Sequence, residues 1–405
     1  MKKMKIIGVN SLPVGSPANI MRGILEVAHT ELDASVQSFY GAWKNCPSEY
    51  MGSRVYGYSY ENYLSFFIGK YLGLPYQGSY LGTLNLIHKV KEFEPDIIHL
   101  HNLHLSTINL ELFFGFIRSM DYRVVWTLHD CWSFTGRCTH FQMTNCNKWK
   151  KGCNKCSLDS GVYPQSMFDV TEKMWRKKKK LFSGHSNLTI VTPSKWLTNL
   201  VKDSFLNQYN IITINNGIDL DVFKPRDNCF KDKHNINGKF MVLGVSFSWS
   251  DRKGYDIFLK LSKILDERYI IVLVGISDIN IGNLPKNIIA IEKTNNQIEL
   301  SEIYSAADVF VNPTREDNYP TVNMEAIACG LPVITFSTGG SPEILDKDTG
   351  FVVEKDDVEN LVEKIKYVCE RKCFSKEIIS DRAKKFDMHK HYLEYVDLYK
   401  NIMKI

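Results

Sequence analysis

Residues 309–330 combine residue types that bind sugars and phosphates. The acids Glu316 and Asp317 follow a short apolar run, and Glu325 lies further on in a stretch expected to be helical. Carboxylates suit sugar and ribose hydroxyls, because their two oxygens can accept two hydrogen bonds. Alternatively, Asp317 and Glu325 are present only because acids favour the first turn of a helix. The spacing alone leaves both interpretations open.

The same segment predicts an anion site. Thr321 is a suitable N-cap for the expected helix, and Pro320 precedes it. A helix N-terminus offers free N–H groups and the positive end of the helix dipole, and this one would follow the carboxyl end of a strand. We therefore expect a phosphate group to bind close to the acids.

Two cations, Arg252 and Lys253, precede Gly254 in a second candidate loop. Arg and Lys side chains can bind phosphate groups through charge-assisted hydrogen bonds. Without further context, a solvated loop is the alternative interpretation of these residues.

Histidines end two of the expected strands. His129 ends the run 123–129, and His101 ends the run 96–101, with His104 shortly after it. A lone histidine is often structural, but the carboxyl end of a parallel strand is where ligands bind. His129, His101 and His104 are therefore candidates for the wall of a ligand cleft.

Half of the ten cysteines fall between residues 131 and 156. Four of them could form a closed structural zinc site, since thiolates at this density in a reducing compartment suit tetrahedral zinc. Unligated or disulfide-bonded cysteines are the alternative. The four candidate ligands are Cys138, Cys146, Cys153 and Cys156.

The elements that must position these residues are buried strands separated by helix-length segments. This pattern predicts parallel sheets covered on both faces, and it restarts near residue 240 after the polar stretch 224–239, the expected hinge. The fold class is therefore α/β, with two doubly wound sheets. The expected strands are 5–9, 96–101, 123–129, 188–193, 240–245, 270–275, 288–291, 308–312 and 332–335.

Composition agrees with a two-domain globular protein. The chain has 405 residues, and 50 basic against 45 acidic residues leave a net charge of +5, too small to indicate nucleic-acid binding. The N-terminal apolar run is too short for an export signal, and no run is long enough to span a membrane, so we expect a cytoplasmic protein. The basic stretch 174–182 is either a solvated helix face or a peripheral contact with the cytoplasmic membrane face.

Several motifs together resemble one family, the family 4 retaining glycosyltransferases. They cover most of the chain in the order found in that family. The matching segments are Val191–Leu197 (VTPSKWL), Asn216–Asp219 (NGID), Asp317–Val333 (DNYPTVNMEAIACGLPV) and Gly339–Glu343 (GGSPE).

The resemblance implies the GT-B fold, in which two Rossmann-like domains face each other across a cleft. It implies an N-terminal acceptor-side domain over 1–223, with a cysteine-rich insert at 131–156. It also implies a donor-binding domain over 237–385 and a C-terminal helix, 386–405, that packs back on the N-terminal domain.

In the family, two glutamates separated by seven residues contact the donor sugar and the nucleotide ribose. Asp317 and Glu325 have that spacing, with Asp in place of the first Glu. The resemblance also gives His129 a contact with the donor sugar near the reaction centre, and it suggests His101 and His104 for the acceptor side. It makes Arg252 and Lys253 the basic site for the donor diphosphate, whose developing negative charge they can compensate without a catalytic metal. The Gly-Arg that usually follows the donor domain's first strand is missing, because residues 245–249 read VSFSW. The implied donor-binding residues are Gly15, Arg252, Lys253, Glu316, Asn318, Tyr319, Pro320, Thr321, Gly339 and Gly340.

The predicted function is a retaining glycosyltransferase that uses a nucleotide-diphosphate sugar. The cysteine-rich insert resembles that of a branch building colanic acid and capsules, so the expected acceptor is a saccharide, free or linked to polyprenyl diphosphate. Alternatives are a sugar-nucleotide epimerase of the same fold and an inactive donor-binding scaffold of a polysaccharide complex. A dehydrogenase is disfavoured, because no G-x-G-x-x-G follows either first strand.

Overall fold

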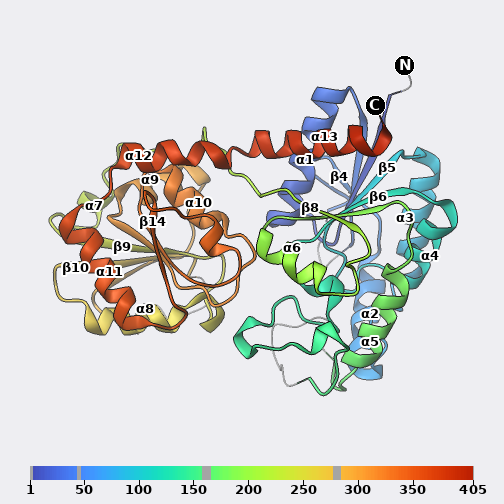
Figure 1. Cartoon of the computed structure of the whole chain (residues 1–405), viewed down its shortest axis with the longest axis horizontal. Helices are drawn as coiled ribbons and strands as arrows, with labels where there is room; N and C mark the ends of the chain where they lie inside the picture. The colour runs from blue at the N-terminus through green and yellow to red at the C-terminus, as the bar shows by residue number, and fades with distance from the viewer. Residues whose placement is uncertain (1–2, 43–46, 157–165, 277–283, 405) are drawn as a thin grey trace. The chain divides into compact units, whose positions relative to one another are not determined.

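The computed structural model describes residues 3–42, 47–156, 166–276 and 284–404, and it divides the chain into two compact units (Figure 1). Unit 1 comprises Met1–Ile214 and Tyr392–Ile405, and unit 2 comprises Asn215–His391. The chain therefore enters unit 2 once and returns to unit 1 within its last helix.

Unit 1 is built on an eight-stranded sheet in the order β3-β4-β2-β1-β5-β6-β7-β8, in which all pairs are parallel except β3 with β4. The strands are β1 (Lys5–Asn10), β2 (Ser35–Tyr40), β3 (Glu49–Tyr50), β4 (Ser53–Val55), β5 (Ile97–Leu100), β6 (Arg123–Thr127), β7 (Leu188–Thr192) and β8 (Asn210–Thr213). The helices are α1 (Ser16–Leu32), α2 (Ser59–Leu72), α3 (Tyr80–Phe93), α4 (Leu110–Met120), α5 (Thr171–Phe182) and α6 (Lys195–Lys202), with short 3-10 turns η1 (Trp132–Phe134), η2 (Gln142–Thr144) and η3 (Lys148–Lys150) in the insert.

Unit 2 is built on a six-stranded parallel sheet in the order β11-β10-β9-β12-β13-β14. The strands are β9 (Phe240–Val245), β10 (Tyr269–Val274), β11 (Ile288–Ile291), β12 (Val309–Asn312), β13 (Val333–Phe336) and β14 (Gly350–Val353). The other elements are α7 (Phe230–Lys233), α8 (Tyr255–Ile264), α9 (Gln297–Ala306), α10 (Thr321–Ala328), α11 (Val358–Arg371), α12 (Lys376–Arg382), η4 (Asp251–Lys253), η6 (Ser341–Glu343) and η7 (Ala383–Phe386).

The strands of unit 2 are covered on both faces, as their continuous apolar sequences predicted. Neighbouring residues of β9 enter different cores: Met241 and Leu243 pack in one cluster, and Val242 packs in another. Counted within the unit, the strand order is 3-2-1-4-5-6, which is the doubly wound Rossmann order. The order reverses between β9 and β12, and ligands of such sheets bind at the carboxyl ends of the strands beside this point.

The polar stretch 224–239 is not where the structure changes unit. Phe223 and Ile236 are buried in a core of unit 2, together with Ile218, and α7 forms within the stretch. These apolar anchors draw the stretch into unit 2, so the first passage between the units comes at Ile214 and Asn215 instead.

The last helix, α13 (Met388–Met403), lies beside α1 and packs against β5 and β6 of unit 1 (Figure 1). The Tyr399 hydroxyl lies 2.6 Å from Nδ1 of His99, and Thr127 lies 3.2 Å from the Tyr395 hydroxyl. A Cβ on Gly23 of α1 would lie 2.4 Å from the Tyr392 ring, so only glycine allows this approach. The apolar face of α13 is therefore covered within unit 1.

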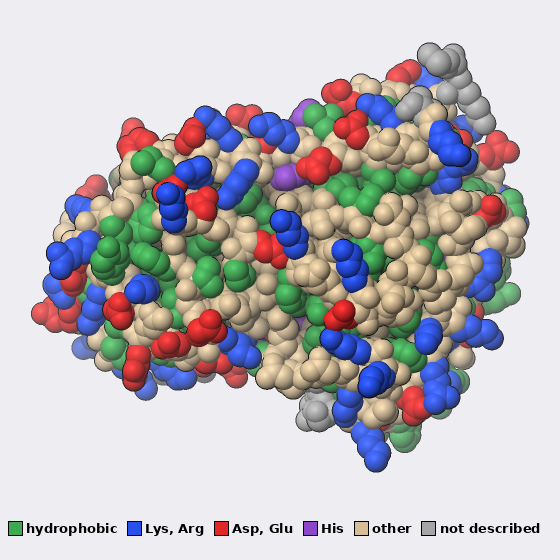
Figure 2. Space-filling view, viewed as in Figure 1, with side chains coloured by type: hydrophobic (Ala, Val, Ile, Leu, Met, Phe, Trp, Pro, Cys, Tyr) green, Lys and Arg blue, Asp and Glu red, His purple; other side chains and the backbone are tan. Residues whose placement is uncertain are grey.

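The basic helix α5 differs from the expectation of an amphipathic membrane contact over 174–182. Its apolar residues Met174, Trp175 and Phe182 are buried in the core of unit 1, which leaves no apolar face for a membrane. Lys178 is also buried and donates to the carbonyl oxygens of Trp132 (2.6 Å) and Thr135 (3.2 Å). Figure 2 shows Lys and Arg side chains at the lower right, where Figure 1 draws α5, so its exposed side is a solvated basic face.

Candidate functional site

The candidate donor residues of unit 2 lie where its strand order reverses. Lys253 ends η4, which follows β9, and Asp317 lies in the loop that follows β12. Their side chains meet, with Lys253 Nζ 2.5 Å from Asp317 Oδ2, and each is about one-fifth exposed. The structure thus brings together two residues 64 positions apart, one from each side of the reversal.

Two glycines permit the close packing of the loops around this ion pair. Gly254 has φ +75°, and a Cβ there would lie 2.4 Å from the carbonyl oxygen of Pro313. Gly339 has φ +58°, and a Cβ there would lie 1.6 Å from the carbonyl oxygen of Asp317. A larger residue at either position would push apart the loops that carry Lys253 and Asp317.

Arg252 holds the two loops together through their backbones. Its Nη1 donates to the carbonyl oxygen of Glu316 at 3.0 Å, and its own carbonyl oxygen accepts from the Arg315 N–H at 2.8 Å. The Glu316 side chain is 5% exposed, whereas that of Asp317 reaches solvent. Of the two adjacent acids, Asp317 is therefore the one placed to meet a ligand.

The start of α10 differs from its expected form. Thr321 is the first helical residue, and Pro320 occupies the N-cap position, with no side-chain cap hydrogen bond. The Thr321 side chain instead hydrogen-bonds Glu325, one turn further along. Proline before a helix fixes an extended backbone by itself, which leaves the threonine hydroxyl for the carboxylate.

Glu325 is held by a tyrosine from the neighbouring helix α9. The Tyr304 hydroxyl donates to Glu325 Oε2 at 3.1 Å. Burial raises the pKa of Glu325 to about 7, although the hydrogen bonds from Tyr304 and Thr321 act to lower it. The carboxyl group therefore changes charge near neutral pH.

The other expected donor residues line the same loops. Asn318 and Tyr319 are buried, and burial together with the charge of Glu343 raises the pKa of the Tyr319 phenol. Gly339 and Gly340 lie directly before η6, with Gly340 at its N-cap position. Asn318 and Tyr319 thus lie in the loop after β12, and Gly339 and Gly340 lie in the loop after β13.

Unit 1 places its candidate histidines at the ends of β5 and β6, which are paired neighbours in the sheet. His101 Nδ1 and His129 Nε2 are 2.9 Å apart, and their rings stack. Burial lowers the pKa of His129 to about 4 and that of His101 well below its usual value. Both imidazoles are therefore neutral at physiological pH.

His104 has a partner of its own. Its Nε2 lies 3.1 Å from Oδ2 of Asp130, the residue after His129. Burial alone would raise the pKa of Asp130, but the hydrogen bond and charge of His104 hold it below the usual value. His101, His129 and Asp130 line one small cavity with Trp132 and Ser133. The expected donor residue Gly15 lies elsewhere in unit 1, between β1 and α1, where it has φ +88°.

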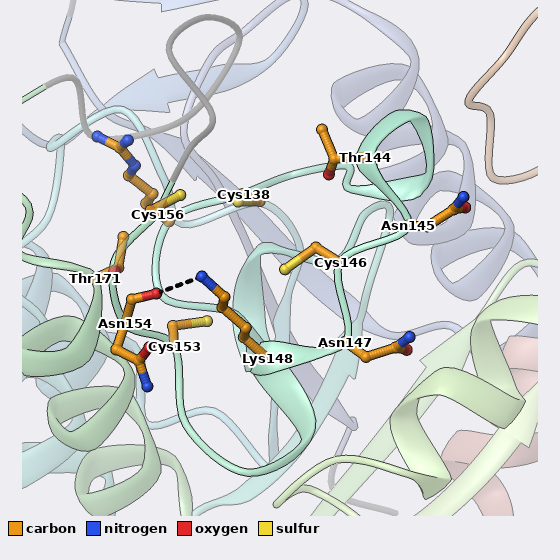
Figure 3. A pocket seen from close by; sticks show the side chains of 11 residues that line it. Cys138, Thr144, Asn145, Cys146, Asn147, Lys148, Cys153, Asn154, Cys156 and Thr171 are labelled. Carbon is orange, nitrogen blue, oxygen red and sulfur yellow. Dashed lines mark hydrogen bonds between the residues drawn. The ribbon is translucent and has the colours of Figure 1, made fainter.

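The four cysteines expected to bind zinc line one cavity in the insert of unit 1 (Figure 3). Burial raises the pKa of Cys138 to about 12 and that of Cys153 to about 11. In Figure 3 the sulfur atoms of Cys146 and Cys153 point inward, and Lys148 lines the same cavity.

The four cysteine thiols suit zinc chemically, but their positions relative to one another are less favourable for binding it. In the part of the chain that the structure describes, no three His, Cys, Asp or Glu side chains are grouped so that they could hold a metal ion. The zinc site therefore stays a prediction.

Two residues in or near the site were not predicted from the sequence. Tyr304 contacts Glu325 from a helix whose sequence carries no motif, so no local signal could have identified it. Phe247 is fully exposed in the loop after β9, where the family's Gly-Arg was missing. An apolar residue two positions after the first strand of unit 2 is the signal that could have singled it out.

Comparison with solved structures gives the class of the fold. The chain is similar to sucrose-phosphate synthase from Thermosynechococcus elongatus, with a TM-score of 0.73 and 17% identity over 99% of this chain and 100% of that one. It is also similar to Anabaena HepE in complex with UDP-glucose, with a TM-score of 0.67 and 15% identity over 98% and 100%. The predicted GT-B fold class is confirmed.

Sequence comparison gives the class of enzyme. Residues 227–386 match the family described as glycosyl transferases group 1. A protein of Escherichia coli (strain K12) named colanic acid biosynthesis glycosyl transferase WcaC is 27% identical over 76% of this chain and 77% of its own length. CapM of Staphylococcus aureus, named a capsular polysaccharide biosynthesis glycosyltransferase, is 27% identical over 44% of this chain and 50% of its own. The protein is a glycosyltransferase with a group 1 domain, and the predicted resemblance is confirmed.

Proposed function

We propose that the protein is a retaining glycosyltransferase that moves a sugar from a nucleotide-diphosphate donor to a saccharide acceptor in polysaccharide biosynthesis. The observation that carries the proposal is the Lys253–Asp317 pair at the strand-order reversal of the group 1 domain. A cation and a carboxylate side by side match the two ends of a sugar diphosphate. The names of WcaC and CapM, and UDP-glucose bound to HepE, support this donor and this setting.

The ion pair suggests how a donor would bind to Lys253 and Asp317. In the structure, Lys253 neutralises Asp317. A diphosphate would compete for the lysine, and the released carboxylate could then accept hydrogen bonds from the sugar hydroxyls. Arg252 would add charge to the diphosphate side, and Glu325 would accept from the ribose.

The proposed chemistry needs no protein nucleophile. The acceptor oxygen bonds to the anomeric carbon on the face from which the diphosphate leaves, and the bond from that carbon to the phosphate oxygen breaks. Its electron pair departs with the diphosphate, and a phosphate oxygen takes the acceptor proton. Lys253 and Arg252 stabilise the charge that develops on the leaving group.

The histidines of unit 1 have a complementary role in the proposal. His129 is neutral and hydrogen-bonded to His101, so it can donate to or accept from a sugar hydroxyl without adding charge. His101 and His104 would lie on the acceptor side. The acceptor itself is proposed to be a saccharide, free or carried on polyprenyl diphosphate.

A screen of nucleotide diphosphates and nucleotide sugars by thermal shift tests the donor. A bound donor raises the melting temperature by mass action, so the preferred base and sugar are identified together. The same donor should fail to stabilise Lys253→Ala, while the variant unfolds at the wild-type temperature without ligand. If no nucleotide sugar stabilises the wild type, the donor assignment is wrong.

A donor-only assay separates transfer from epimerisation. A transferase leaves the donor intact until an acceptor saccharide is added, whereas an epimerase alters or releases the nucleotide without one. Donor binding with no turnover on any acceptor would indicate an inactive scaffold instead. Product stereochemistry then tests retention, because an inverted anomeric centre would exclude the same-face mechanism.

A further inference from the structure

Helix α2 of unit 1 buries its polar side and exposes its apolar side. Its buried residues are polar or small: Glu61, Asn62, Ser65 and Gly69. Its large apolar and aromatic side chains face solvent, as shown by the exposed fractions of Tyr60 (62%) and Leu72 (61%). A surface helix normally buries its apolar side, so the exposed side of α2 requires an explanation.

The inversion is fixed by polar contacts with the start of α3. The Glu61 carboxylate accepts the Leu81 N–H at 2.8 Å and the Gly82 N–H at 2.7 Å, and so satisfies the free N-terminal amides of α3. Ser79 donates to Asn62 Oδ1 at 2.9 Å. Rotating α2 to bury its apolar side would expose those amides and place this carboxylate in solvent, so the observed orientation is the stable one.

The exposed apolar residues of α2 continue onto neighbouring segments. The Met167 N–H donates to the carbonyl oxygen of Lys70 at 2.9 Å, which places the segment 166–168 against the end of α2. We call the combined surface the aromatic face. Its exposed members are Tyr58, Tyr60, Tyr63, Leu64, Phe66, Phe67, Tyr71, Leu72, Tyr80, Leu81, Leu84, Met167 and Phe168.

The charges on α2 and its flanking residues are mainly positive, and the exposed acid Asp169, directly after Phe168, accepts hydrogen bonds from the backbone N–H groups of Cys156 and Thr171. Glu61 is the only acid between residues 51 and 91, and it is buried in the contact with α3. The same stretch carries Arg54, Lys70 and Lys89. Lys70 Nζ lies 5.8 Å from the ring centre of Phe66 and 5.4 Å from that of Tyr71, so its stem covers the rings while its charge remains near solvent.

We propose that the aromatic face docks on the surface of an anionic lipid bilayer. Tyrosines with an apolar body and a polar tip, flanked by lysine and with no exposed carboxylate on α2 itself, suit the boundary between headgroups and acyl chains. In the residues that the structure describes, no helix is long and apolar enough to cross a membrane, so attachment here would be at the surface. The positive charges complement anionic headgroups and disfavour a neutral or basic protein partner.

Co-sedimentation of the full chain with vesicles tests the proposal. Wild type should bind vesicles of phosphatidylcholine mixed with phosphatidylglycerol and bind pure phosphatidylcholine vesicles more weakly. The triple variant Tyr63→Ser, Leu64→Ser, Phe67→Ser should lose about tenfold or more of this affinity, because it removes exposed apolar area without touching the buried side of α2. Lys70→Glu should weaken binding only to the anionic vesicles.

A matched control removes exposed apolar residues elsewhere. Ile264, Ile298 and Ile378 are similarly exposed but belong to unit 2. Their replacement by serine should leave vesicle binding unchanged, and unfolding curves should show that both triple variants fold.

Three outcomes would overturn the proposal. Wild type that binds neither vesicle excludes a lipid surface, and unchanged binding by the folded α2 variant places the contact elsewhere, such as on the basic side of α5. Self-association that the α2 variant abolishes, without vesicle binding, would show that the face joins two copies of the chain. These readouts do not depend on transfer activity, so they stand or fall apart from the proposed function.

Discussion

The two units hold their candidate residues in opposite electrostatic states. In unit 2, Lys253 and Asp317 form an ion pair with both partners reaching solvent. In unit 1, His101 is buried and His129 partly buried, and the two are hydrogen-bonded to each other and neutral at physiological pH. Lys253 can exchange Asp317 for an incoming phosphate group, whereas the neutral histidines can only orient a ligand through uncharged hydrogen bonds.

This difference suggests a division of labour in the proposed reaction. Charge compensation for a leaving diphosphate requires cations that are accessible before the ligand arrives. Orientation of an uncharged sugar requires donors and acceptors whose tautomers are fixed by their surroundings. Each unit has the arrangement that suits one of these tasks.

The largest effect is expected for Lys253→Ala. Loss of the cation should lower transfer by about 10²- to 10³-fold, because the leaving group loses its stabilising charge. Steady-state kinetics with the donor found in the thermal-shift screen measures this. Lys260→Ala is the matched control, since Lys260 pairs with Asp256 on the exposed side of α8 and should change the rate by less than about twofold. Near wild-type turnover by Lys253→Ala would refute the role of the ion pair.

A smaller effect is expected for His129→Ala, a loss of about tenfold or more in kcat/KM from one lost hydrogen bond to the sugar. The exposed His88→Ala serves as control. Because burial lowers the pKa of His129 to about 4, the pH profile between about pH 5 and 8 should not contain a step that belongs to this residue. A step near neutral pH that disappears in His129→Gln would show that the histidine is charged in the working enzyme.

Glu325 links stability to pH in unit 2. Its pKa is about 7 in the folded protein, above the usual 4.5, so between these values the folded protein binds more protons than the unfolded chain. The free energy of unfolding should therefore fall as pH rises through this window, by at most about 3 kcal/mol, and the loss should be complete above about pH 7.

Urea unfolding at about pH 5 and pH 8 measures this difference, and Glu325→Gln should remove it. The exposed Glu359→Gln should keep the wild-type dependence. An identical pH dependence in wild type and Glu325→Gln would show that the carboxyl is already ionised at acid pH.

The smallest predicted effect on transfer concerns the cysteine-rich insert. If its thiols bind structural zinc, the purified protein should contain about one zinc per chain, and chelation should lower the melting temperature while ligand-saturated transfer changes little. Elemental analysis decides the matter. Less than about half a zinc per chain, with no loss of stability on chelation, would leave the cysteines unligated. Cys373→Ser, outside the insert, is the control for general thiol effects.

Much of the fold could be predicted from local sequence. The apolar runs that begin near residues 5, 97, 123, 188, 240, 270, 288, 309 and 333 all form strands, because continuous β-branched and aliphatic residues suit sheets buried on both faces. The Lys253 and Asp317 loops were also identified, because strand ends and acidic or basic loop residues are visible in order. Their direct contact was not predicted, since it depends on which strands become neighbours.

Helices α2 and α5 show where local sequence misleads. The basic run of α5 suggested a membrane contact, but Met174, Trp175 and Phe182 turned inward because the insert and α4 offered them an apolar core. In α2 the polar side is buried, because the Glu61 carboxylate accepts the free amides at the start of α3, and no local pattern in the sequence predicted this contact. Which side of a helix is buried therefore depends on the packing and hydrogen-bond partners that the tertiary structure provides.

The sequence by itself determined the two βα patterns, the group 1 signature and the residues available for chemistry, because these depend on neighbours along the chain. Only the tertiary structure decided that Lys253 neutralises Asp317, that Tyr304 holds Glu325 and that His101 stacks on His129. It also decided which side of α2 meets solvent. These outcomes join residues far apart in sequence, and their energies depend on burial and on partners that no local pattern contains.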